Sequence, residues 1–497
     1  MLLKNIFSKL TIKQVLLLGL IVRLIAVVFS KGYAFHDDHF GVVELAWQWR
    51  DGINFNWTGG DVYIFSLVYA GIHYLLIGAC EKIGINNPQD IMFVIRLFHA
   101  LFSLLAIYFS YKLVLRLISH KTTAIAVSLI FALFWIFPFM SVRNLQEFFC
   151  VPFLLMGSYY LADTTNKTQS IILAALFFAL AFTIRMQTVF IPFGTAAYML
   201  FRKESWKKAL LFGVLFLISL LATQGLFDYA LYGNPIASVK AYFEYNANPE
   251  NIKGYPQGPW YQYIGTVAGI VLGFSFIPLI VGYFKSVRIS SPLAAIFFGT
   301  LFFFIFHSWY SNKQERFILP FIPYFILLGI IGYREVYENN LHKKWLKAAT
   351  KFFIGWFVIV NTIGLVVITF TYSKKSRVEA MSYLRKKGDI TNFILEGAYE
   401  APAAPLFYLG KHLSYYSTTA ANIDSLPQAI MYRSQPPPNY IILTGNKDFE
   451  NRLARLKKMF PLMKEEKVIK PGFVDNLAYW LNPKHNLNEN WYIYSNK

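Results

Sequence analysis

Two adjacent carboxylates follow the first hydrophobic segment of the chain. Asp37 and Asp38 lie between His36 and His39, and Glu44 comes seven residues after Asp37. A carboxylate beside an acceptor hydroxyl can take its proton as the oxygen attacks an electrophilic carbon. We interpret Asp37 as this general base, and Asp38 and Glu44 as groups that orient the acceptor or the base. The alternative is that the pair only ends a transmembrane helix in a polar way.

The sequence leaves open which of the two aspartates faces the acceptor. In a helical turn, neighbouring side chains diverge by about 100°, so both cannot point at one hydroxyl.

Four cationic residues stand where hydrophobic segments end. Arg143 and Arg185 each follow such a segment, and Lys313 and Arg316 share a later loop. Arginine binds phosphate through a planar fork and lysine binds it as a point charge. We predict that these four side chains bind a phosphate group. The alternatives are that the arginines are snorkelling helix-end residues and that the later loop is an ordinary polar one.

Other polar and aromatic residues in these loops are candidates for substrate contact. Trp260, Tyr261 and Tyr263 offer flat faces against which a sugar ring could pack. The predicted substrate-binding set is His36, His39, Asp228, Tyr255, Trp260, Tyr261, Asn312, Gln314 and Glu315. The two histidines are three residues apart and could instead hold a metal ion.

The composition indicates a polytopic α-helical membrane protein. Of 497 residues, 56% are hydrophobic, and windows of about 17–25 apolar residues match a bilayer span. A net charge of +20 would suggest nucleic acid in a soluble protein. Here the basic residues lie in short loops between spans, which fits anionic lipid and excludes nucleic acid as a partner. The two cysteines fall in apolar stretches and predict neither a disulfide nor a thiolate metal site.

Hydropathy predicts a membrane domain over residues 1–372, with eleven spans. The first span is a retained signal-anchor, and residues 41–90 are expected to form interfacial helices. Basic loops place the N-terminus in the cytoplasm and the acidic cluster on the extracytoplasmic side. The spans are expected near residues 11–29, 91–115, 123–141, 148–162, 170–184, 188–201, 209–227, 263–284, 291–307, 317–333 and 349–371.

The tail, residues 373–497, has a different pattern. It contains a helix-like stretch over 377–387 and strand-like runs over 393–395 and 440–443, with prolines between them. We predict a small soluble α/β domain, which the odd number of spans places outside the cell.

Two stretches resemble the motifs of family 22 glycosyltransferases, the GT-C-fold mannosyltransferases of asparagine-glycan and GPI-anchor assembly. Residues 35–40 followed by Glu44 are similar to the first-loop signature of that family. Residues 312–317 followed by Leu319-Pro320 are similar to its His-Lys-Glu-x-Arg-Phe loop.

The resemblance extends over about residues 15–335. Residues 254–260 are similar to a Tyr-Gly-x-x-Pro-Trp stretch, and Arg96, Arg143 and Arg185 fall where the family has arginines. The sequence departs from the family pattern at four positions: His36 replaces a proline, Asp38 a glutamate, and Asn312 and Gln314 a histidine and a glutamate.

The resemblance implies an inverting GT-C glycosyltransferase. The donor would be a polyprenyl-phosphate-linked sugar, with mannose as the expected sugar, and the acceptor a hydroxyl of a glycan or lipid-linked molecule. Lys313 and Arg316 would bind the donor phosphate, with Arg143 and Arg185 in support. We expect no metal and no other cofactor, because the cationic side chains can neutralise one leaving phosphate. A bacterial inner membrane is the expected location.

Three other functions were considered. A lipid-linked oligosaccharide transporter or flippase would also carry cations facing a cavity, but it should have paired halves. An O-linking protein glycosyltransferase would share the same chemistry. A structural scaffold would not explain the clustered charges.

Overall fold

The computed structural model describes residues 9–53, 62–165, 167–203, 205–432, 436–481, 486 and 488–496. The chain divides into two compact units, which are described one at a time. The first comprises residues 1–24, 55–72 and 97–366, and the second residues 25–54, 73–96 and 367–497. The second unit therefore combines the C-terminal tail with two stretches from the N-terminal part of the chain.

Helices make up the first unit. Four helices belong wholly or partly to its N-terminal part and its last segment: α2 (Ile12–Phe29), α5 (Val68–Lys82), α6 (Pro88–Ile118) and α21 (Lys344–Thr369). Between α6 and α21 lie α7 (Lys121–Leu133), α8 (Phe137–Met140), α9 (Gln146–Phe149), α10 (Val151–Leu161), α11 (Thr168–Ile184), η2 (Met186–Val189), α12 (Phe190–Leu200), α13 (Trp206–Leu220), η3 (Leu221–Gly225), α14 (Leu226–Tyr232), α15 (Ala237–Ala247), α16 (Pro249–Ile252), α17 (Gln262–Ile270), η4 (Gly273–Ser275), α18 (Phe276–Ser286), α19 (Ser291–Trp309), η5 (Glu315–Ile318) and α20 (Phe321–Glu338).

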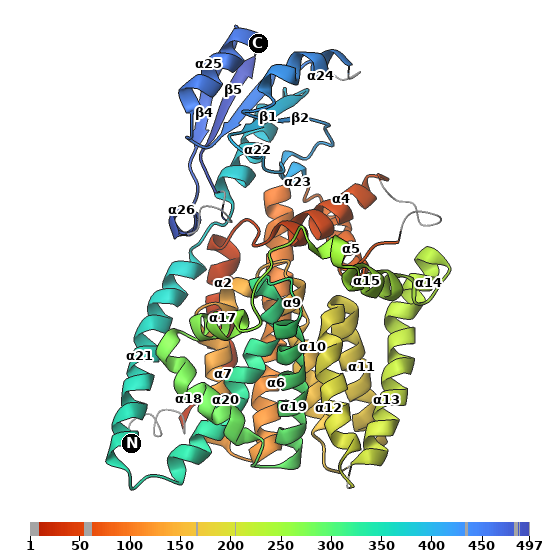
Figure 1. Cartoon of the computed structure of the whole chain (residues 1–497), viewed down its shortest axis with the longest axis vertical. Helices are drawn as coiled ribbons and strands as arrows, with labels where there is room; N and C mark the ends of the chain where they lie inside the picture. The colour runs from red at the N-terminus through yellow and green to blue at the C-terminus, as the bar shows by residue number, and fades with distance from the viewer. Residues whose placement is uncertain are drawn as a thin grey trace. The chain divides into compact units, whose positions relative to one another are not determined.

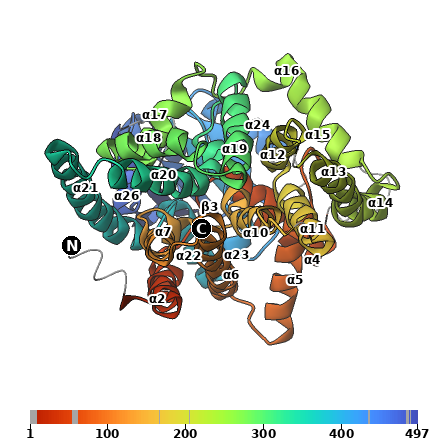
Figure 2. The same cartoon turned by 90° about the horizontal axis from the view of Figure 1, so that it is seen from below.

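Small residues bring pairs of these helices close together. Helix α18 packs on α20, α12 on α19, and α11 on both α10 and α13 (Figures 1 and 2). A Cβ atom at Gly282 of α18 would lie 1.8 Å from the Gly329 carbonyl oxygen, and one at Gly332 would lie 1.9 Å from the Gly282 oxygen. Close backbone approach through small residues is typical of helices that pack within a bilayer.

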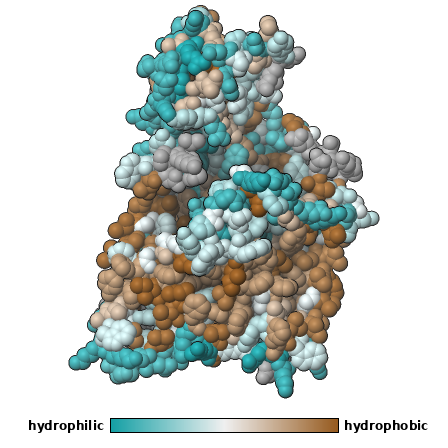
Figure 3. Space-filling view, in the orientation of Figure 1, coloured by the Kyte–Doolittle hydropathy of each residue, from teal (hydrophilic) through white to brown (hydrophobic). Residues whose placement is uncertain are grey.

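The helices present apolar side chains to the outside. On α13, Leu210, Val214, Leu217 and Ile218 are all exposed, and Figure 3 shows hydrophobic side chains gathered over the helices of the first unit. Five helices of the described chain are long and apolar enough to cross a membrane, or six if the bent pair 262–270 and 273–286 counts as one span. The protein is therefore an integral membrane protein.

Helix occupies each of the eleven predicted spans, although several of these helices are short. The number of crossings and the orientation of the chain stay predictions. Residues 54–61 of the predicted interfacial region lie outside the described residues.

The second unit contains a five-stranded sheet in the order β2-β1-β3-β5-β4. Strands β1 and β2 are parallel, as are β1 and β3, whereas β5 is antiparallel to both β3 and β4. The strands are β1 (Phe393–Gly397), β2 (Tyr416–Thr419), β3 (Tyr440–Thr444), β4 (Met463–Ile469) and β5 (Trp491–Asn496). The helices are α3 (His36–Asp38), η1 (His39–Glu44), α4 (Leu45–Arg50), α22 (Lys375–Lys387), α23 (Leu406–Leu409), η6 (Ile423–Ser425), α24 (Leu426–Tyr432), α25 (Phe449–Met459) and α26 (Phe473–Leu481).

Alternate residues of the central strands enter two separate cores. Phe393 and Ile442 pack with residues of α22 and α23 on one face, whereas Ile394 and Ile441 pack with residues of α24 and α25 on the other. Both faces of β1 and β3 are therefore buried, which explains their continuous hydrophobic runs. The prediction of an α-helical membrane protein with a small C-terminal α/β domain is confirmed, while the predicted boundary at residue 372 stays a prediction.

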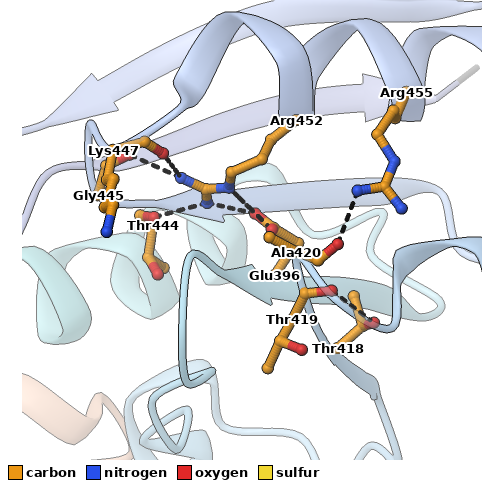
Figure 4. A network of polar contacts seen from close by, with 9 residues as sticks. All are labelled: Glu396, Thr418, Thr419, Ala420, Thr444, Gly445, Lys447, Arg452 and Arg455. Atoms are coloured by element: carbon orange, nitrogen blue, oxygen red, sulfur yellow. Dashed lines mark hydrogen bonds and ion pairs between the residues drawn. The ribbon is translucent and has the colours of Figure 1, made fainter.

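A buried ion pair closes the carboxyl ends of β1 and β3. The Arg452 guanidinium of α25 donates to both carboxylate oxygens of Glu396, with Nε 2.9 Å from Oε1 (Figure 4). It also donates to the carbonyl oxygens of Thr444 and Lys447 at 2.7 and 2.8 Å. Both charged side chains are fully buried, so each depends on the other to offset its lost hydration.

We predict that Arg452→Ala destabilises the sheet by about 3–5 kcal/mol, because the Glu396 carboxylate would stay buried without its cation. Hydrogen exchange of the β1 and β3 amides in the full chain measures this loss. The control is Arg455→Ala on the same helix, whose partner Asp424 is 75% exposed and whose loss should cost about 1 kcal/mol or less. Equal effects of the two substitutions would contradict the assignment.

Candidate active site

The two predicted carboxylates lie in an irregular helical segment, called here the acidic turn (residues 36–44). A short α-helix, His36–Asp38, continues into a π-helix, His39–Glu44, and then into α4. A π-helical turn is rare and is frequent at functional sites, because its wider winding re-aims the side chains. The acidic turn belongs to the second unit.

The structure separates the two aspartates by exposure. Asp37 is exposed, whereas Asp38 is 5% exposed. Neighbouring His36 is also exposed and stacks on Phe40, with ring centroids 4.2 Å apart. Of the two carboxylates, Asp37 is therefore the one that an incoming hydroxyl can reach from solvent.

His39 and Glu44 hold the acidic turn in place. Glu44 Oε1 accepts a hydrogen bond of 3.1 Å from the backbone N–H of Phe407 and lies 3.3 Å from His39 Nε2. The His39 ring is stacked between Tyr33 and Tyr408, at centroid distances of 4.4 and 5.4 Å. These contacts tie the turn to α23 within the second unit. They fit the predicted orienting role of Glu44. Because both faces of the buried His39 ring are covered by tyrosine rings, a substrate cannot stack on it.

Two of the three predicted arginines, Arg185 and Arg316, lie beside one carboxylate of the first unit. Glu147, at the start of α9, is 1% exposed, and its Oε1 lies 2.9 Å from Arg185 Nη2 and 3.7 Å from Arg316 Nε. Arg316 Nε also donates to Gln314 Oε1 at 2.9 Å. We call Glu147, Arg185, Arg316 and Gln314 the arginine cluster.

Several buried polar atoms around this cluster lack hydrogen-bond partners within the described chain. Arg185 Nε has no acceptor there, although the guanidinium makes its ion pair with Glu147. His307 uses Nδ1 to donate to the Phe303 carbonyl, 2.8 Å away, and its Nε2 has no described partner. Asn312 Oδ1 and Ser308 Oγ are also buried without a hydrogen-bond partner in the described chain. Buried polar atoms nearly always have partners, so this concentration indicates a site for water or a polar ligand.

Lys313 takes a different place from the predicted one. Its ammonium donates to the backbone carbonyl oxygens of His307 and Ser308, at 2.7 and 2.8 Å, and to that of Tyr310. Burial lowers the pKa of the Lys313 ammonium. Its three N–H donors therefore hold the C-terminal end of α19, where carbonyl groups lack helical partners.

The two family-like stretches of the first unit lie side by side. Gln257 and Asn312 form an antiparallel bridge, and Lys313 N–H donates to the Pro256 carbonyl at 2.8 Å. A Cβ atom at Gly258 would lie 2.8 Å from Lys313 Cγ, so a larger residue at this crossing would require the Lys313 and Gln262 side chains to shift. The Tyr263 hydroxyl donates to the Gln314 carbonyl at 2.9 Å, and the Lys313 ammonium lies 5.2 Å from the centroid of its ring.

The remaining predicted residues of the first unit are not part of the arginine cluster. Arg143 is buried, with its guanidinium 4.3 Å from the Phe139 ring centroid. Asp228 is buried and accepts hydrogen bonds from the backbone and side chain of Ser238, at the start of α15, so it fixes that helix. The exposed predicted residues are Tyr255, Trp260, Tyr261 and Glu315.

Three residues of this region were given no role by the sequence. Glu147 had no predicted role, yet it lies at the centre of the arginine cluster. His307 could have been found as a polar residue inside an apolar helix, which is rare in membrane segments. Tyr242 of α15 hydrogen-bonds Gln187, and burial raises its pKa to about 12. No sequence pattern connects α15 to this site.

The model of the Alg9-like mannosyltransferase family matches residues 14–399, which is most of the chain. The chain belongs to the Alg9-like mannosyltransferase family. This assignment confirms the predicted family and the prediction of a GT-C glycosyltransferase.

Two relatives in this family are named GPI mannosyltransferase 3. The one from Candida glabrata is 21% identical over 421 residues, which cover 71% of this chain and 67% of the relative. The one from Trypanosoma brucei brucei is 23% identical over 310 residues, which cover 59% of this chain and 51% of the relative. The chain therefore spans about half of the trypanosome protein.

Solved structures share the fold at low identity. ArnT from Cupriavidus metallidurans, bound to undecaprenyl phosphate, aligns with 97% of both chains at a TM-score of 0.61 and 12% identity. The Archaeoglobus fulgidus oligosaccharyltransferase aligns with 95% of this chain and 70% of its own at a TM-score of 0.54 and 11% identity. These similarities establish that this family member has the GT-C fold.

The position of Lys313 predicts a structural effect in this family member. Lys313→Ala should destabilise the protein by about 1–3 kcal/mol, because three buried carbonyl groups would lose their donor. Lys313→Met keeps the aliphatic part of the side chain but not the ammonium, so this variant should lose nearly as much stability. Thermal unfolding of the purified protein measures both. The control is Lys253→Ala, whose side chain is 68% exposed and should change stability by no more than about 0.5 kcal/mol. Unchanged stability of both Lys313 variants would show that the ammonium does not hold this loop.

Proposed function

We propose that this protein transfers a sugar, expected to be mannose, from a polyprenyl-phosphate donor to a hydroxyl of a glycan or lipid-linked acceptor. The reaction inverts the anomeric centre and takes place on the extracytoplasmic side of the membrane, which for a bacterial protein is the outer side of the inner membrane. Family membership supports the sugar and the reaction class. The fold shared with a structure that holds undecaprenyl phosphate supports the donor class.

The arginine cluster is the observation that carries this proposal. A donor phosphodiester has one negative charge, and the leaving phosphate gains a second as the bond to the sugar breaks. Arg185 and Arg316 both lie beside Glu147, and Arg185 Nε has no acceptor among the described residues, which leaves this guanidinium with a donor for an anionic ligand. Fixed donors aimed at a developing negative charge stabilise the transition state more than the ground state.

Glu147 positions the two guanidinium groups and does not itself bind the phosphate. A carboxylate would repel the phosphate if it stood alone, but a buried carboxylate paired with two arginines fixes the planes of both forks. Arg185 and Arg316 replace Lys313 as the main phosphate-binding residues of the proposal. Lys313 holds the loop that carries Arg316, and Arg143 supports the site from the loop before α9.

The acidic turn supplies the base. Asp37 takes the proton of the acceptor hydroxyl, which its exposure supports, while Asp38 and Glu44 keep the turn in shape. His36 and the exposed aromatic residues Trp260 and Tyr261 are proposed to contact the sugar or the acceptor. Neither a metal nor another cofactor is needed for this step, because the cations of the site face the leaving phosphate.

The direct test is transfer by the purified protein in lipid nanodiscs. Radiolabelled mannose on polyprenyl phosphate should appear on an added glycolipid acceptor, while a nucleotide-linked sugar should give no product. Activity that survives EDTA supports the absence of a metal. A protein that moves lipid-linked oligosaccharide across vesicles without forming a new bond would be a transporter and would overturn the proposal. Transfer to a peptide hydroxyl would make it an O-linking glycosyltransferase.

Removing either arginine should weaken donor use. Arg185→Ala and Arg316→Ala should each lower kcat/KM for the donor by about 10- to 100-fold, because a charge-assisted phosphate contact contributes roughly 1.5–3 kcal/mol. Steady-state kinetics with varied donor measures the change. The control is Arg288→Ala, an exposed arginine before the other end of α19, about 28 Å away along the helix. It should leave the kinetics unchanged. Wild-type kinetics in both cluster variants would remove these arginines from the phosphate site.

Removing the basicity of Asp37 should slow turnover. Asp37→Asn keeps the shape of the side chain, and the loss of general-base catalysis should lower kcat by about 10²–10⁴-fold while donor binding is retained. Asp38→Asn should cost less, and Asp90→Asn, at an exposed acid in the same unit, should cost nothing. If Asp38→Asn is inactive and Asp37→Asn is active, Asp38 is the base. Full turnover in both would reduce the acidic turn to a helix end.

A further inference from the structure

Helix α26 of the second unit carries an exposed apolar face. Phe473, Leu477, Trp480 and Leu481 are 77%, 41%, 76% and 67% exposed. At about 100° per residue these four positions fall within an arc of about 100°. On the opposite side, Asp475 is buried. An amphipathic helix with its apolar side exposed and its polar side buried has the reverse of the orientation expected in water.

The N-terminal end of α26 is fixed to the chain that leaves the last membrane helix. The Lys375 N–H donates to Asp475 Oδ2 at 3.2 Å. A Cβ atom at Gly472 would lie 2.5 Å from the Tyr372 carbonyl oxygen, so these backbones are in contact. Helix α21 ends at Thr369, and the three residues from there to Tyr372 reach at most about 11 Å. The start of α26 therefore lies close to the end of a membrane-spanning helix.

The end of α21 itself presents apolar side chains to its surroundings. Val367 and Phe370 are 41% and 52% exposed, as expected where a helix meets lipid. The start of α26 thus lies close to the end of a helix whose surface is already suited to the bilayer. Tryptophan prefers the interface between lipid and water, where its ring is buried and its N–H stays hydrated. The exposed Lys470 before α26 adds a positive charge that suits anionic headgroups.

We propose that α26 is an interfacial anchor, whose apolar face inserts into the bilayer surface on the side where α21 ends. The anchor would bind lipid headgroup and upper acyl-chain regions, not a protein. It would hold α26 and the chain that leaves α21, which Asp475 and Gly472 contact, at the membrane surface. This inference does not depend on the proposed reaction, and either can fail alone.

Fluorophore quenching by lipids tests the anchor in the full-length protein. Cys80 and Cys150 are the two cysteines of the chain and are buried, so a thiol reagent should label introduced cysteines selectively. The variants Leu477→Cys and Trp480→Cys are each labelled with the fluorophore bimane and reconstituted into vesicles of phosphatidylethanolamine and phosphatidylglycerol. The quencher is a nitroxide near the headgroup or deep in the acyl chain. Phe370→Cys is the positive control, and Lys457→Cys on the exposed side of α25 is the negative control.

The shallow quencher should act on positions 477 and 480 about as strongly as on position 370, and several-fold more than on position 457. At positions 477 and 480, quenching by the shallow nitroxide should also exceed quenching by the deep nitroxide, because an interfacial helix inserts only about 5–10 Å. Adding Phe473→Glu and Trp480→Glu to the label at 477 should lower its quenching towards that of position 457. Quenching at 477 and 480 no greater than at 457 would overturn the proposal. Protection of both labels from lipid nitroxide and from aqueous iodide would assign the face to a protein partner, which also overturns it.

Discussion

The structure of the first unit depends on the cost of burying an unpaired charge. Glu147 is nearly fully buried between apolar helices, where an isolated carboxylate would lose several kilocalories of hydration. Arg185 follows α11 directly and Arg316 lies in η5. Because both must reach the same carboxylate, three segments that are far apart in sequence are held at one end of the helix bundle.

The cost of burying an unpaired charge also shapes the second unit, but there the buried charges are fully paired. Glu396 and Arg452 satisfy each other at the carboxyl ends of two parallel strands, where open α/β sheets often bind ligands. There the pair is complete, and it seals the crevice between β1 and β3. In the arginine cluster the pairing is incomplete, because Arg185 Nε lacks an acceptor within the described chain. Complete pairing stabilises a fold, whereas incomplete pairing leaves capacity for a ligand.

The acidic turn shows how a distant part of the chain shapes a candidate catalytic group. Glu44 accepts its hydrogen bond from Phe407, 363 residues later in the chain. That contact and the stacked His39 ring hold a π-helical turn that leaves Asp37 exposed and Asp38 buried. A mobile loop could not distinguish two neighbouring carboxylates in this way. The C-terminal unit therefore has a structural part in presenting the acid, and an anchor at α26 would restrict its motion further.

The sequence by itself determined the class of protein, the membrane helices and two of the five strands. Apolar run length and loop charge predicted the helices, and short runs of β-branched and aromatic residues in the tail predicted β1 and β3, because these signals are local. Motif spacing identified the family and placed candidate charges in loops. The tertiary structure decided what those charges do. Lys313 caps α19, Asp228 fixes α15, and Glu147, which had no predicted role, became the centre of the arginine cluster. The partner of a buried charge depends on which loops meet in space, and sequence spacing does not contain that information.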